Sequence, residues 1–147
     1  MNTIARVRFA GALLACLFWL PVASAAQAAP FQDYRNGACG SGICNINFAP
    51  VPSGRRLDIS NVSCYLRVSQ DADVYALQLL VAQGANISSA VTVVPQFVDS
   101  VAGIGDRVYS ADHHIFAFAN AGQRFRIYAE LKGGVYRQLA CTSAGKC

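Results

Sequence analysis

The chain has 147 residues, of which 12 are lysine or arginine and eight are acidic, giving a net charge of +4 at pH 7. Two of the arginines lie in the first ten residues, before an apolar run, and the remainder of the chain carries ten basic residues against eight acidic ones. That balance excludes the strongly basic surface of a nucleic-acid-binding protein. The length fits one domain with a real hydrophobic core.

The N-terminal segment has the order of a secretory signal peptide. Two arginines are followed by an uncharged apolar run at 9–20 and by small residues at 22–25. We expect cleavage after Ala25, with Ala28 as the second choice, and therefore a secreted or periplasmic protein. The apolar run is about 12 residues long, below the roughly 17–25 that cross a bilayer, so no stable membrane span is expected after cleavage.

Two alternatives to cleavage fit this segment less well. An uncleaved anchor would have to extend through Pro21, Ser24 and Gln27 to reach a spanning length. A lipoprotein would be modified at Cys16, but apolar residues continue at 17–20, where a polar tether is expected. We divide the chain into a signal peptide at 1–25, an irregular N-terminal arm at 26–42 and one β-sandwich domain at 43–147.

The folded region shows the period-two alternation of β-strands and no convincing helical period. Residues 44–48 are the first alternating segment, and they end before Pro50 and Pro52. Proline removes a backbone donor, so it marks the end of this strand.

The next segment, residues 56–69, alternates with a slip in its phase. Leu57 and Ile59 are odd-numbered, whereas the apolar positions from Val62 onward are even-numbered. A β-bulge near residues 60–61 would keep both sets facing inward.

Three further strands are predicted in the middle of the chain. Residues 90–98 are rich in β-branched side chains and end near Asp99, and residues 108–119 contain the apolar run 115–118. Because that run is apolar on both faces, we expect a central strand. Residues 73–83 place four large side chains on one face: Tyr75, Leu77, Leu79 and Val81.

The clearest alternation lies at 123–132, followed by Gly133 and Gly134, which suggest a turn into a hairpin partner at 135–142. Its expected core-facing side chains are Phe125, Ile127, Ala129 and Leu131. Six to eight strands at this spacing predict an all-β fold: a single antiparallel β-sandwich, jelly-roll-like, after the signal peptide.

Two short segments resemble a group of uncharacterised small exported bacterial β-sandwich proteins. Residues 51–59, VPSGRRLDI, resemble the opening of these proteins, and residues 125–129, FRIYA, resemble their ending. The resemblance covers most of residues 43–142. It implies the β-sandwich fold and transfers no catalytic residue.

Five cysteines outside the N-terminal segment predict two disulfides and one remaining thiol in an exported chain. Cys64 and Cys141 each share a face with apolar neighbours, and the glycine-containing linker between Cys39 and Cys44 allows them to meet. We predict Cys64–Cys141 and Cys39–Cys44, with Cys147 free. Cys141–Cys147 and Cys44–Cys64 are the rival pairings, and Cys147 could also join two chains.

A candidate ligand-facing strip combines cationic and aromatic side chains on the expected last hairpin. Arginine pairs with acidic groups and tyrosine offers a stacking face, so the strip could contact an anion or a sugar. The alternative is a solvated, charged sheet face. The strip consists of Arg124, Arg126, Tyr128, Tyr136 and Arg137.

Other polar clusters favour structural roles. His113 and His114 are adjacent on a strand and point to opposite faces, so they are poorly placed to share a metal ion. Asp71 and Asp73 fit a polar turn better than a calcium site, which needs more oxygen ligands. With no nucleophile-and-base motif and no cofactor motif, we expect a protein that is not an enzyme and has no cofactor or metal.

These observations favour an exported, non-catalytic binding or surface-associated module, whose partner could be a glycan or a surface protein. The lack of tryptophan outside the N-terminal segment weakens a carbohydrate role without removing one that relies on other aromatic residues. The first alternative is a structural or assembly subunit whose sheet edges pair with copies of itself or with a partner. The second alternative is an enzyme of unrecognised type.

Overall fold

The computed structural model describes residues 29–147 except 38 and 41, so the predicted signal peptide and Cys16 lie outside the described residues. All the regular elements among the described residues are β-strands. The strands are β1 (Pro30–Gly37), β2 (Ile43–Asn47), β3 (Arg56–Val68), β4 (Asp73–Gln83), β5 (Asn86–Thr92), β6 (Gln96–Ser100), β7 (Arg107–Asn120), β8 (Arg124–Lys132) and β9 (Tyr136–Lys146). In this part of the chain no helix is long and apolar enough to cross a membrane.

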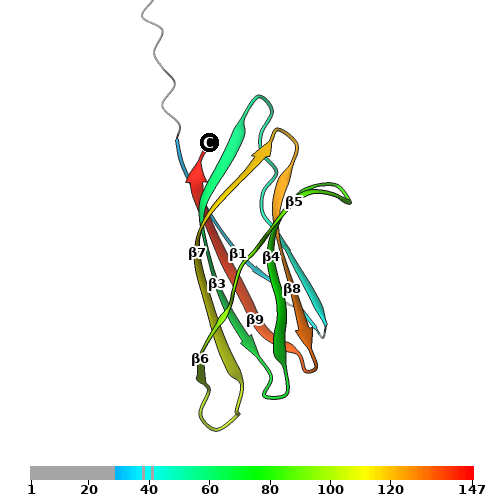
Figure 1. Cartoon of the computed structure of the whole chain (residues 1–147), viewed down its shortest axis with the longest axis vertical. Coiled ribbons are helices and arrows are strands. Elements are labelled where there is room, and N and C mark those ends of the chain that lie inside the picture. The colour runs from blue at the N-terminus through cyan, green and yellow to red at the C-terminus, as the bar shows by residue number, and fades with distance from the viewer. Residues whose placement is uncertain (1–28, 38, 41) are drawn as a thin grey trace, which may run out of the picture.

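The strands form two antiparallel sheets packed as a sandwich. One sheet has the order β1-β9-β3-β7-β6 and is called sheet A; the other has the order β2-β8-β4-β5 and is called sheet B. Figure 1 shows the sandwich from its side, with the chain of β5 and β6 running diagonally from one sheet to the other. Strands from the first half of the chain pair with strands from the second half, β1 with β9 and β2 with β8. This is the strand order of a jelly roll, with β6 added at one edge.

The predicted β-sandwich is therefore confirmed, with nine strands in the described part of the chain rather than six to eight. Its core consists of the inward faces of the two sheets, as the alternation predicted. Ile127 of β8 is fully buried between Ile46 of β2 and Leu79 of β4. The bulge in β3 is also confirmed, because both of its ladders change register between Ile59 and Asn61.

Both predicted disulfides are present. Cys64 and Cys141 lie directly opposite each other on β3 and β9, inside sheet A. Cys39 and Cys44 link the chain after β1, in sheet A, to β2 in sheet B. Cys147 is unpaired among the described cysteines. Two disulfides fit a location outside the reducing cytoplasm.

The prediction of an irregular N-terminal arm at 26–42 is wrong, because its residues Pro30–Gly37 form strand β1. This strand pairs with β9 from Pro30 opposite Lys146 to Gly37 opposite Leu139, so the sandwich begins well before residue 43. The sequence shows no apolar alternation here, because β1 is an edge strand whose side chains are exposed or only half-buried. Backbone pairing holds such a strand without an apolar face.

The predicted hairpin of β8 and β9 is also wrong, since the two strands belong to different sheets. Gly133 and Gly134 have φ of 74° and 59° and carry the chain across the sandwich. A Cβ at Gly134 would overlap the side chains of Ser69 and Ala72, so this crossing passes close to the β3–β4 turn. Two glycines here serve a close approach between loops and not a tight hairpin.

Two of the strands predicted in the middle of the chain need correction. The segment 90–98 is divided between β5 and β6, because Val93 turns into the core and its N–H donates to the carbonyl of Leu77 at 2.8 Å. Tyr75 is 73% exposed, since a register shift between Val74 and Ala76 turns it out of the face it was expected to share.

Candidate binding surface

The five residues of the predicted ligand-facing strip do not form one surface. Arg124, Arg126 and Tyr128 do lie together on the outer face of β8 in sheet B, each half-buried. The guanidinium of Arg126 donates from Nε to Asn47 Oδ1 at 2.8 Å, which ties β8 to β2. The hydroxyl of Tyr128 donates to Glu130 Oε2 at 2.7 Å, and this hydrogen bond raises the pKa of Tyr128.

Tyr136 and Arg137 lie on β9, in the opposite sheet. Tyr136 is only 5% exposed, because the β3–β9 ladder changes register between Arg67 and Val68 and turns its ring inward. Burial is the main cause that raises the pKa of Tyr136 above its ordinary value, with smaller effects from Tyr128 and Glu130. A ring in this position cannot meet a ligand at the surface.

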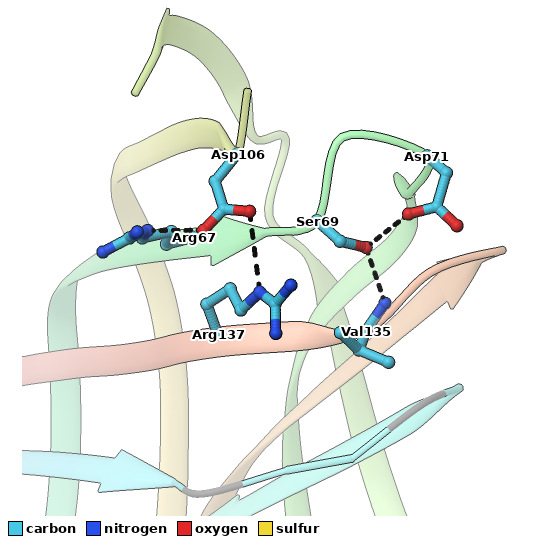
Figure 2. Close-up of polar contacts among 6 residues, drawn as sticks. All are labelled: Arg67, Ser69, Asp71, Asp106, Val135 and Arg137. Atoms are coloured by element: carbon cyan, nitrogen blue, oxygen red, sulfur yellow. Dashed lines mark hydrogen bonds and ion pairs between the residues drawn. The ribbon is translucent and has the colours of Figure 1, made fainter. Parts of the chain in front are cut away.

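Arg137 takes part in an ion-pair cluster around the buried carboxylate of Asp106, at one end of the sandwich (Figure 2). The side chain of Asp106 is 5% exposed and lies between Arg67, whose Nε is 2.9 Å away, and Arg137, whose Nε is 3.5 Å away. The carboxylate thus fastens the loop before β7 to β3 and β9. No local sequence pattern predicts this cluster, because its three members are far apart along the chain.

A second contact in Figure 2 joins two loops at the same end. Ser69 Oγ donates to Asp71 Oδ1 at 2.6 Å and accepts the N–H of Val135 at 2.9 Å. The Ser69 hydroxyl is the main cause that lowers the pKa of Asp71. Asp73 instead pairs with Arg107, so the two aspartates have separate partners and do not converge on one site.

The two histidines also have separate surroundings. His113 is half-buried, and its Nε2 lies 2.9 Å from the carbonyl oxygen of Val94 and 3.2 Å from the Val94 nitrogen. His114 is exposed on the other face of β7. Within the described ranges, no three histidine, cysteine or acidic side chains are placed to hold a metal ion.

The most unusual surface of the molecule was not predicted. The run 115–118 was expected to be buried on both faces, but Phe116 is 98% exposed and Phe118 is 52% exposed. Ile115 and Ala117 point into the core, so the outward phase of β7 carries both phenylalanines on the outer face of sheet A. The two rings therefore point into solvent from the outer face of the sheet.

Polar and charged side chains surround the two rings. The guanidinium carbon of Arg56 lies 4.2 Å from the centroid of the Phe118 ring, a cation–π contact, and Arg56 Nε is 2.7 Å from Asp58 Oδ1. A hollow of about 490 Å³ lies over this part of the sheet. We call this surface the aromatic patch; it comprises Arg56, Asp58, Ser60, Phe116, Phe118 and Lys146.

The aromatic patch adjoins a basic end of the sandwich, where β3 and β8 begin and β7 and β9 finish. Its basic side chains are Arg55, Arg56, Arg124, Arg126 and Lys146. Comparison with protein-family models, curated proteins and solved structures found no match.

Proposed function

We propose that this chain is a secreted or periplasmic, non-catalytic binding module whose ligand site is the aromatic patch. The observation that carries the proposal is the exposure of Phe116, which stabilises no core and leaves a large apolar ring in water. Exposed apolar surface rimmed by polar groups marks interaction sites in proteins. The disulfides and the N-terminal signal order support export.

The chemistry of the aromatic patch favours a sugar as the ligand. A phenylalanine ring offers an apolar face, while Arg56, Asp58 and Lys146 supply hydrogen-bond donors and acceptors beside it. The volume of the hollow, about 490 Å³, lies within the usual range of small-molecule sites. A glycan presents both an apolar ring face and hydroxyl groups, and so matches both parts of the surface.

A glycan array probed with the exported protein tests this proposal, followed by titration of the best-bound glycan. Phe116→Ala should weaken binding about tenfold, equivalent to about 1.4 kcal/mol. Tyr75→Ala is the matched control, because Tyr75 is an aromatic side chain, 73% exposed, on sheet B. Absence of any bound glycan, or a bound glycan whose affinity is equal in the two variants, would contradict the proposal.

A further inference from the structure

Strand β7 has a long edge with no strand paired to it among the described residues. On one side β7 pairs with β3 along nearly its whole length, but on the other side β6 reaches only from Arg107 to Ser110. The chain between β5 and β6 crosses from one sheet to the other (Figure 1), so β6 pairs with β7 only near the start of β7. Ser88 and Ser89 of β5 line a hollow with this part of β7 but form no ladder with it. The backbone groups of residues 111–120 on that side have no ladder partner there.

The other sheet edges carry features that discourage pairing. Strands β2 and β6 have five residues each, and the ladder of β6 is broken between Phe97 and Asp99. The ladder of β5 with β4 shifts between Val81 and Ala82. The edge strand β1 carries the ion pair of Asp33 and Arg35.

The free edge of β7 has fewer of these protections. Residues 111–120 contain no proline, lysine or arginine, and their ladder with β3 shifts register once, between His114 and Ala117. The outward side chains of this edge include the exposed Phe116 and Phe118. An edge without proline or lysine, next to exposed aromatic rings, is a template for another strand.

We propose that two copies of this chain pair antiparallel through this edge, about a twofold axis at Ala117. The pairing would run from His114 of one copy opposite Asn120 of the second, and would place Phe116 opposite Phe118 of the second copy on both sides of the axis. The axis is normal to sheet A, so outward side chains of both copies stay on one face. Opposed aromatic side chains stabilise antiparallel strand pairs.

The distribution of charge along the edge favours a second copy as the occupant. One end of the free segment carries Asp112, and at the other end Asn120 is paired with Arg56 of β3. Antiparallel pairing brings unlike ends together, so each Asp112 approaches the basic end of the second copy. The same patch is used by both copies, as a twofold interface requires.

The pairing also completes the ligand surface, a consequence that rests on the proposed function. Each aromatic patch contains two phenylalanines near the edge of its sheet. In the pair the two patches become continuous across the axis, so a glycan too long for one patch would contact rings from both copies.

Sedimentation equilibrium of the exported Cys147→Ser protein tests the pairing, because this variant removes a covalent link through the tail. We expect a mass of twice the chain that falls on dilution. Phe116→Lys should raise the dimer dissociation constant at least about tenfold, since the change occurs twice across the axis. Tyr75→Lys, which changes an exposed aromatic side chain on sheet B, should leave the dissociation constant unchanged.

A second variant and a second measurement separate the pairing from ligand binding. Asp112→Lys lies outside the aromatic patch, so it should weaken the dimer and leave the affinity of the monomer for a glycan unchanged. Amide hydrogen exchange at residues 114–120 should slow with rising concentration, whereas residues 107–110, already paired on both sides, should not respond. A monomer at near-millimolar concentration, or a dimer indifferent to both variants, overturns the pairing even if glycan binding holds.

Discussion

The two disulfides should stabilise the fold unequally, because they close loops of very different length. Cys64 and Cys141 are separated by 77 positions, and Cys39 and Cys44 by five. We consider two double variants, Cys64→Ala/Cys141→Ala and Cys39→Ala/Cys44→Ala, since each removes one bridge together with both of its sulfur atoms.

The magnitude follows from the entropy that each bridge removes from the unfolded chain. Loop closure at the two separations corresponds to about 4.5 kcal/mol for the long bridge and about 2 kcal/mol for the short one. The long bridge joins two strands that already lie side by side in sheet A. Its removal should therefore change the unfolded state more than the native ladder.

Guanidinium denaturation of both variants, followed by far-ultraviolet circular dichroism, measures these costs. The long-bridge variant should lose about 2–3 kcal/mol more than the short-bridge variant. Its denaturant dependence should also steepen, because the unfolded chain becomes less compact. Equal losses, or a greater loss from the short bridge, would show that native-state packing and not loop closure governs their effect.

Three further changes test the packing. Ile127→Asp should prevent stable folding, whereas Tyr128→Asp, on the half-buried outer face, should reduce stability far less. Equal losses of stability in thermal unfolding would mean that the inward face of β8 is wrongly assigned. Gly145→Ala should lower the free energy of unfolding by about 1–3 kcal/mol, because the added Cβ would overlap a carbonyl oxygen of β3. Gly40→Ala is the control in the same denaturation assay, since the space around Gly40 is open. Burial raises the pKa of the Tyr136 hydroxyl, so the protonated side chain favours the folded state, and the free energy of unfolding should fall as the pH rises above 10.0. Tyr136→Phe should reduce this alkaline loss of stability. An unchanged pH profile in this variant would contradict the burial of the hydroxyl.

The candidate site was only partly accessible to sequence reasoning. Arg124 and Arg126 were expected on a solvent face and lie on one, but Tyr136 is buried by a register shift that no local pattern reveals. The exposure of Phe116 was missed because apolar residues in both phases of a strand usually indicate a buried centre. The outward phase of β7 also holds Asp112 and Asn120, a polar signal that could have pointed to solvent.

The sequence by itself determined the local features of this protein: the β class, the inward faces of β3 and β8, the bulge in β3 and the pairing of four cysteines. Each of these depends on alternation or spacing within short stretches of chain. Only the tertiary structure decided that β8 and β9 separate into two sheets, that Asp106 lies between two arginines, and that the edge of β7 is free. Those features depend on where the chain crosses between sheets, and a crossing is set by the packing of the whole sandwich, which no local stretch encodes.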